Sequence, residues 1–301
     1  MKIAISGLGR MGGQIAQKLT EGGHHVIAHN RSPEPVTHAS TYGATPAYTK
    51  ADVIAAFNDE PVIVWIMVPA DVVESELNEW LQVAPKRSIF IDGGNSDYRG
   101  DNGRARRVSD AGSTLLDIGT SGGVWGYENG FSMMAGGDEP TYDTLIPLLN
   151  TLAVPNGGHQ YFGPNGAGHY VKMVHNAIEY GMMQSLAEGY RMLKEGPYSD
   201  LDLTKAGEVW QQSSVVTSWL NELTRQALHE NPKLDNISGV VAESGETRWT
   251  LETAKDLGIP LPAIQASFDV RLASQQGDIN FATKLLAAMR NKFGGHNVDG
   301  H

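Results

Sequence analysis

Short apolar runs alternate with helical patterns in the first half of the chain. Six runs have the length and composition of buried strands: residues 2–6, 25–29, 62–68, 88–93, 114–119 and 131–137. Helical or turn-rich segments separate most of these runs, which is the order of βαβ units in a parallel sheet. The pattern therefore predicts an α/β domain with a doubly wound parallel sheet.

From about residue 166 the strand pattern gives way to helical periodicity. The longest helical runs are residues 169–196, 203–228 and 259–276. A stretch dense in glycine and proline, residues 162–168, precedes this change and is typical of a domain boundary. We therefore expect two domains, residues 1–165 and an all-helical domain of residues 166–301.

The first helix of the second domain carries a polar stripe. Four polar side chains fall within an arc of roughly 100°: Lys172, Asn176, Glu179 and Tyr180. Four apolar side chains lie on another side and are expected to face the core: Val171, Val174, Ile178 and Met182. Taken alone, such a stripe is more often a solvated face than a functional site, so its meaning depends on motifs elsewhere.

Composition narrows the classes of function. A formal net charge of −11 argues against general nucleic-acid binding, which favours a basic surface. No apolar run reaches the roughly 18 residues of a membrane helix, and the N-terminal run is too short for a signal peptide. The sequence has no cysteine, and its ten histidines lack a metal-ligand spacing. We expect a cytoplasmic protein with no metal and no nucleic-acid or membrane partner.

The first predicted strand runs into a glycine-rich loop, "GLGRMG", which a helical pattern follows. Gly7 permits the tight turn, Gly9 lets the backbone approach a pyrophosphate, and Gly12 allows close packing of helix on strand. The helix N-terminus offers free N–H groups to the anion. This context predicts a Rossmann-type dinucleotide-binding domain. The expected cofactor contacts in the loop are Gly7, Leu8, Gly9, Arg10, Met11 and Gly12.

The end of the second predicted strand bears on the choice of cofactor. NAD-binding domains commonly place a carboxylate there for the ribose 2′-hydroxyl, whereas this chain has Asn30, Arg31 and Ser32. Arg31 could pair with a 2′-phosphate, or it could be a surface arginine that stacks on adenine. NADP is therefore the favoured cofactor, with NAD, or use of both, as the alternative.

Two further glycine-rich segments follow strands on the side where such sheets bind ligands. Asn95 and Ser96 lie in "IDGGNSDY", and Ser121, Gly122 and Gly123 lie in "DIGTSGGVWGYENG". Exposed N–H groups beside small hydroxyl side chains suit a carboxylate or an alcohol. Either segment alone could be an ordinary turn.

Together, the segments "GLGRMG", "NRS", "DGGNSDY", "GTSGGVWG" and "GAGHYVKMVHNAIEYGMMQ" resemble the β-hydroxyacid dehydrogenase superfamily, and most closely the short form of its 6-phosphogluconate dehydrogenase family. The resemblance implies oxidative decarboxylation of 6-phospho-D-gluconate to D-ribulose 5-phosphate, with reduction of NAD(P), in the pentose phosphate pathway. One alternative is a dehydrogenase of the same superfamily that acts on a small unphosphorylated 3-hydroxy acid. Another is a non-catalytic NADP-binding sensor or scaffold.

The resemblance also implies roles for individual residues. Lys172 would take the proton from the C3 hydroxyl as hydride leaves, and Glu179 would protonate C1 after decarboxylation. Lys172 must begin neutral, and burial would lower its pKa whereas a nearby Glu179 would raise it. Expected contacts to the sugar acid are Asn95, Ser121, Gly122, Gly123, His175 and Asn176, with Tyr180 at its 6-phosphate. Further expected cofactor contacts are Val68, Pro69, Ala70 and Asn95.

Cationic residues near the C-terminus match the family's phosphate contacts. The segment "FDVRLAS" supplies Arg271, and the tail "RNKFGGH" supplies Arg290 and His296, which in the family reach the neighbouring subunit's site. The resemblance therefore implies a homodimer or a dimer of dimers. One departure is "ESGETRWT", which lacks a lysine that the long form has there, and Arg248 is the candidate substitute.

Overall fold

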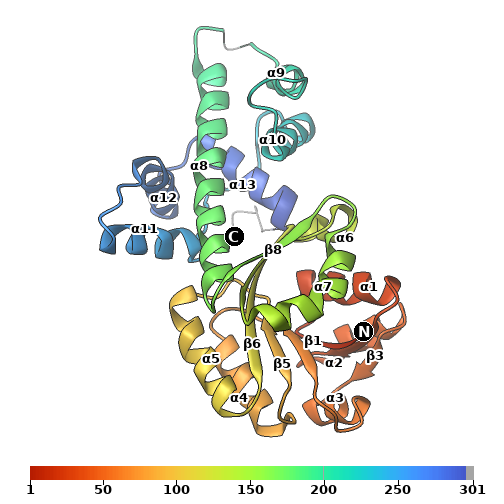
Figure 1. Ribbon diagram of the computed structural model, residues 1–301. Coiled ribbons are helices and arrows are strands. Elements are labelled where there is room, and N and C mark those ends of the chain that lie inside the picture. Colours follow the sequence, from red (N-terminus) through yellow and green to blue (C-terminus); the bar gives the residue numbers. More distant parts are fainter. Residues whose placement is uncertain (199, 296–301) are drawn as a thin grey trace. The chain divides into compact units, whose positions relative to one another are not determined.

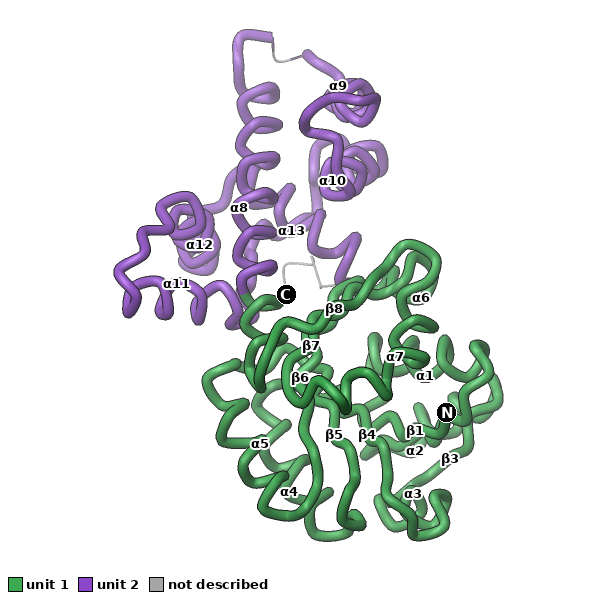
Figure 2. Tube along the Cα trace, viewed as in Figure 1, with its two compact units in different colours: residues 1–173 green, residues 174–301 purple. Residues whose placement is uncertain are grey.

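The computed structural model describes residues 1–198 and 200–295 (Figure 1). The chain forms two compact units, Met1–Met173 and Val174–His301 (Figure 2). The first contains the sheet and the second is helical, which confirms the predicted fold class. Helix α8 (Ala167–Glu195) belongs to both units, and the domain boundary near residue 165 stays a prediction.

The first unit is built on an eight-stranded sheet in the order β3-β2-β1-β4-β5-β6-β7-β8. The strands are β1 (Lys2–Ser6), β2 (His25–His29), β3 (Thr45–Ala47), β4 (Ile63–Ile66), β5 (Ile89–Asp92), β6 (Thr114–Ser121), β7 (Ser132–Gly137) and β8 (Gly158–Gly163). All six predicted strands are confirmed, with small shifts at their ends. The sheet is mostly parallel, as predicted, and departs from this at one place, where β6 and β7 pair antiparallel. The connection between them is too short for a parallel crossover.

The sequence prediction missed the two edge strands, β3 and β8. Strand β3 has only 3 residues and contains Pro46, which weakens a strand pattern. Strand β8 reads "GHQYFG", and its side chains alternate between exposed and half-buried. Edge strands bury less apolar surface than central ones, so their composition is a weaker signal.

Both faces of the sheet are covered, which explains the continuous apolar runs of its central strands. Ile3 and Ile5 of β1 belong to one apolar cluster, whereas Ala4 between them belongs to another, since successive side chains point to opposite faces. The helices of this unit are α1 (Arg10–Glu21), α2 (Pro33–Ser40), α3 (Lys50–Ala56), α4 (Val73–Val83), α5 (Asp101–Asp110), α6 (Gly126–Asn129) and α7 (Glu139–Ala153).

The second unit holds the rest of α8 and five further helices among its described residues: α9 (Leu203–Trp210), α10 (Trp219–Glu230), α11 (Glu246–Asp256), α12 (Pro262–Gln275) and α13 (Phe281–Gly294). Side-chain oxygens of Asp202, Ser218 and Asn280 cap three of these helices. An apolar cluster that includes Tyr190 and Leu285 forms the core of this unit. Within the described ranges, no helix is long and apolar enough to cross a bilayer.

The apolar side of α8 is not its buried side, contrary to the prediction. Ile178 and Met182 are 52% and 46% exposed, and Val171 and Val174 are only partly buried. On the polar side, Lys172 is 5% exposed. Periodicity identifies the faces of a helix but not which face the rest of the chain covers. The polar stripe is therefore not a solvated face.

Candidate active site

The glycine-rich loop lies where the strand order reverses, because β1 has β2 on one side and β4 on the other. Gly7 has a φ of +99°, and a Cβ there would lie 2.4 Å from the carbonyl oxygen of Met67. A Cβ on Gly12 would lie 2.0 Å from the carbonyl oxygen of Gly7. A Cβ on Gly9 would meet nothing within 4 Å, and no acidic residue lies in the first turn of α1. This open space at the N-terminus of α1 fits a pyrophosphate.

The residues after β2 and the loop are joined by hydrogen bonds. The Asn30 side chain accepts from the Leu8 N–H at 3.0 Å and donates to the Ser32 carbonyl oxygen at 3.2 Å, so it shapes the loop. Arg31 and Ser32 are exposed, and Ser32 begins α2 without a side-chain capping bond. Arg31 is accessible to a ligand, and its contact with a 2′-phosphate stays a prediction.

Other predicted cofactor contacts lie close to the same loop. Val68, Pro69 and Ala70 follow β4, and Val68 Cγ1 would be 3.0 Å from a Cβ on Gly7. Arg10 and Met11 are the first two residues of α1. The tertiary structure thus brings together the predicted contacts from the ends of β1, β2 and β4.

The predicted substrate contacts follow the next two strands of the sheet. Asn95 is exposed in the loop after β5, where a Cβ on Gly93 would lie 1.8 Å from the Trp65 Nε1 atom. Ser121 ends β6, and Gly122 and Gly123 follow with φ values of +133° and +54°. Since β5 and β6 are parallel neighbours, both segments leave the sheet at the same edge.

Lys172 is placed by close packing of α8 on β6. A Cβ on Gly119 would lie 2.3 Å from the Cβ of Lys172, so only glycine leaves room there. The Asp117 carboxylate accepts hydrogen bonds from the N–H groups of Gly166 and His169, at 2.8 and 3.0 Å, and so caps the start of α8. Sequence reasoning missed Gly119 and Asp117, although both lie in the quoted "DIGT" segment.

The second unit buries two arginines. Arg271 is 1% exposed, and its guanidinium carbon lies 3.2 Å from the centre of the Tyr180 ring, which is itself buried. Arg290 is also buried, and within residues 1–198 and 200–295 neither arginine has a carboxylate at ion-pair distance. Burial, together with the neighbouring Arg290, lowers the pKa of Arg271 to about 10. Two desolvated cations are costly unless an anion binds, and a phosphate dianion would satisfy both.

The polar side of α8 has a partner that the sequence prediction missed. The Asn176 amide donates to Glu246 Oε1 at 2.9 Å, and its oxygen lies 2.9 Å from Nδ1 of His175. Glu246 is buried, and its other carboxylate oxygen has no hydrogen-bond partner in the part of the chain that the structure describes. These contacts fix the orientation of the Asn176 amide. Glu179 lies on the same helix and is partly buried.

Two predicted phosphate contacts gain no support from the geometry. Arg248 forms an ion pair of 2.6 Å with Glu243 and remains partly exposed, so its substitution for the long form's lysine stays a prediction. His296 lies outside the described residues.

Comparison with known proteins identifies two family models that together match most of the chain. The NAD binding domain of 6-phosphogluconate dehydrogenase matches residues 2–162, and the C-terminal domain of 6-phosphogluconate dehydrogenase matches residues 168–300.

Relatives match from end to end. A putative 6-phosphogluconate dehydrogenase of Bacillus subtilis is 38% identical over 98% of each chain. An NAD(+)-dependent, decarboxylating 6-phosphogluconate dehydrogenase of Haloferax volcanii is 39% identical over 99% of this chain and 98% of its own. A more distant Bacillus subtilis relative, 31% identical over 91% of this chain and 61% of its own, is named as NADP(+)-dependent.

Solved structures match both units. A Plasmodium falciparum 6-phosphogluconate dehydrogenase has a TM-score of 0.81 and 29% identity, over 92% of this chain and 62% of its own. A Mycobacterium tuberculosis 3-hydroxyisobutyrate dehydrogenase has a TM-score of 0.74 at 21% identity, over 94% of this chain and 97% of its own, which shows the shared fold.

Proposed function

The chain belongs to the 6-phosphogluconate dehydrogenase family, and from this we infer that it converts 6-phospho-D-gluconate to D-ribulose 5-phosphate and carbon dioxide, with reduction of NAD(P). The observation that supports the phosphorylated substrate best is the buried pair Arg271 and Arg290, which has no carboxylate at ion-pair distance among the described residues. A dehydrogenase for a small unphosphorylated acid has no use for these two desolvated cations.

The chemistry begins at Lys172, which we assign as the base. Its amine takes the C3 hydroxyl proton while the bound cofactor supplies the hydride acceptor. The resulting β-keto acid loses carbon dioxide because the C3 ketone accepts the electrons of the breaking bond. The protonated amine of Lys172 then stabilises the developing negative charge on that oxygen.

Glu179 is assigned as the acid that protonates C1 of the enediol. It follows Lys172 by seven residues on one continuous helix, so the helix spaces base and acid by about 10 Å along its axis. Asn176, held by Glu246, would donate to the substrate from the same side of α8. Asn95, Ser121, Gly122, Gly123 and His175 complete the proposed sugar contacts.

Turnover with two substrates tests this function. We expect NADP or NAD to be reduced in the presence of 6-phosphogluconate, with one carbon dioxide released per cofactor reduced. We expect no comparable rate with 3-hydroxyisobutyrate. Absence of turnover with 6-phosphogluconate under both cofactors would refute the proposal, and reduction without carbon dioxide release would refute the decarboxylating step.

The substitution Gly119→Ala should lower kcat by at least roughly tenfold. The added methyl group would displace the Cβ of Lys172, and misplacement of a catalytic group by about 1 Å can reduce a rate by about 10²-fold. Gly158→Ala in β8 is the matched control, because a Cβ there meets nothing within 4 Å. Equal kcat values for the two folded variants would contradict the role of Gly119.

Cofactor preference is proposed to favour NADP through Arg31. Replacing Arg31 by alanine should lower kcat/KM with NADP about tenfold or more, since a charge-assisted contact to the 2′-phosphate is lost. The value with NAD should stay within about twofold. An equal fall in kcat/KM with both cofactors would instead indicate that Arg31 stacks on adenine.

The active enzyme is proposed to be a homodimer or a dimer of dimers. Arg290 is buried within its own chain, which speaks against the expectation that it reaches the neighbouring subunit's site. The exposed apolar side chains Ile178 and Met182 of α8 are suited to burial against a partner. A monomer mass by light scattering at assay concentration, with full activity, would exclude this arrangement.

We also propose a cytoplasmic location, which fractionation of the source cells would test.

A further inference from the structure

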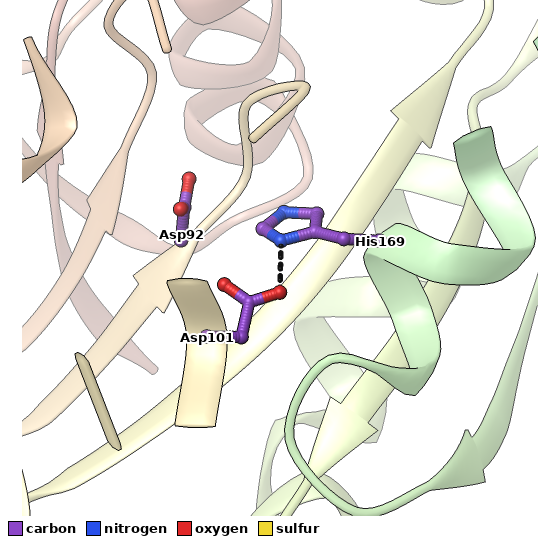
Figure 3. Close-up of side chains that lie close together, drawn as sticks. All are labelled: Asp92, Asp101 and His169. Carbon is purple, nitrogen blue, oxygen red and sulfur yellow. Dashed lines mark hydrogen bonds and ion pairs between the residues drawn. The ribbon is translucent and has the colours of Figure 1, made fainter. Parts of the chain in front are cut away.

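The first unit contains a buried cluster of charged side chains that has no role in the proposed reaction. His169 Nδ1 and Asp101 Oδ2 are 2.8 Å apart (Figure 3). The other Asp101 oxygen accepts hydrogen bonds from Arg104 Nη2 at 2.7 Å and Nε at 3.2 Å. Arg104 Nε is 4.0 Å from Asp92 Oδ2. Asp92, Asp101 and His169 each offer an atom within 4.8 Å of the others. These three side chains and that of Arg104 are all buried.

At one end of the cluster, Asp92 holds the loop that carries Asn95. Its Oδ1 accepts a hydrogen bond from the Gly94 N–H at 3.2 Å, and its Oδ2 accepts one from the Ser96 hydroxyl at 2.7 Å. Asn95 lies between these two residues. One carboxylate therefore restrains the chain on both sides of Asn95 while the Asn95 side chain stays exposed.

At the other end, His169 lies one helical turn before Lys172 on α8. Its imidazole contacts Asp101, and its backbone N–H donates to Asp117 of β6 at 3.0 Å. Side chain and backbone are thus both held in the turn that leads to Lys172. Because a helix is stiff over one turn, the position of His169 determines the position of the Lys172 backbone, from which the amine extends.

The charges of the cluster favour an ion-pair network over a metal site. Burial alone would lower the pKa of His169, but Asp92, Asp101 and Asp117 outweigh it and raise the pKa to about 9. The imidazolium and Arg104 then face the carboxylates as two cations, and a divalent metal would add a third. Among the described residues His169 Nε2 has no hydrogen-bond partner, and an unpaired buried polar atom is a cost of the kind that functional sites retain.

We propose that the Asp92–Arg104–Asp101–His169 cluster holds the Asn95 loop and the Lys172 turn in one fixed arrangement, with His169 as a positioning residue for hydride transfer. This inference rests on the proposed roles of Lys172 and Asn95. It assigns no contact between His169 and substrate. Its failure is distinguishable from failure of the proposed function, since the wild-type enzyme would still turn over 6-phosphogluconate.

The variant His169→Gln tests the proposal, because glutamine keeps an N–H donor for Asp101 but lacks the charge. We expect kcat to fall by at least roughly 30-fold while the Kd for NADPH stays within about threefold. The primary isotope effect with 3-deuterated substrate should rise toward its intrinsic value. The matched control is His159→Gln, whose ring bonds Tyr142 and Asn150 and which should keep kcat within about twofold. A folded His169→Gln enzyme with near-normal kcat would overturn the proposal.

Coupling between the two ends provides a second readout. If the cluster positions Asn95 and Lys172 relative to each other, His169→Gln should lower kcat much less in an Asn95→Ala background than in the wild type. Strictly multiplicative effects would show that the two ends are independent and would contradict the proposal.

Should His169→Gln fail to fold, Asp92→Asn replaces it, because asparagine keeps an acceptor for the loop while removing one charge. The same loss of kcat at unchanged NADPH affinity is expected, and near-normal kcat would overturn the proposal. The wild-type enzyme offers an independent measurement by ¹⁵N NMR of its imidazoles. One imidazole should keep both N–H groups at pH 8, and a His169 ring that is neutral at pH 7 would equally exclude the charged cluster.

Discussion

Replacing Lys172 by methionine is expected to lower kcat with 6-phosphogluconate by about 10³-fold or more. Loss of a positioned general base typically costs 10²–10⁴-fold, and here the same amine also stabilises the C3 oxygen. Methionine matches the length of the buried stem that packs at Gly119, so the fold should survive. Steady-state kinetics give kcat, and NADPH fluorescence gives a cofactor Kd that should be unchanged.

The control for this substitution is Lys205→Met, at an exposed lysine of α9 that pairs loosely with Asp202 at 3.7 Å. It removes the same charge from the chain and should leave kcat unaltered. A near-normal rate in Lys172→Met would show that another group is the base. A loss of cofactor affinity equal to the loss of rate would indicate a structural role instead.

Replacing Arg271 by methionine is expected to lower kcat/KM for 6-phosphogluconate by about 100-fold, mainly through KM. The lost interaction is a charge-assisted contact to phosphate, worth about 1.5–3 kcal/mol for each hydrogen bond. The same change should leave the melting temperature unchanged or raise it. Burial lowers the pKa of Arg271, which means that its charged form is disfavoured in the folded state, and methionine removes that cost.

Two comparisons make this test specific. With unphosphorylated gluconate as substrate, wild type and Arg271→Met should have similar, low kcat/KM values, because there is no phosphate to bind. Arg225→Met is the control, since Arg225 pairs with Glu222 at 2.7 Å and has no proposed ligand. An equal loss with both substrates, or a large fall in melting temperature, would identify Arg271 as a structural residue.

The Rossmann-type domain was predictable because its signals are local. The strand–glycine loop–helix order specifies backbone conformations, and Gly7 and Gly12 are each required by contacts of under 3 Å within or beside the loop. Strands β3 and β8 were missed because their position at the sheet edges leaves them without the apolar runs of central strands. The antiparallel pairing of β6 and β7 was also not predictable, because the pattern of apolar residues does not specify the direction in which a strand runs.

The sequence by itself determined the order of the six inner strands, the cofactor loop and, through resemblance, the identity of the proposed base, acid and phosphate ligands. Only the tertiary structure decided which face of α8 is buried, because that depends on which surfaces of distant segments cover it. The same holds for Gly119 against Lys172, Glu246 against Asn176, and the His169 cluster. The members of each contact are far apart along the chain. A buried charged side chain must be paired with other protein groups because water no longer solvates it, and only the tertiary structure shows which groups those are.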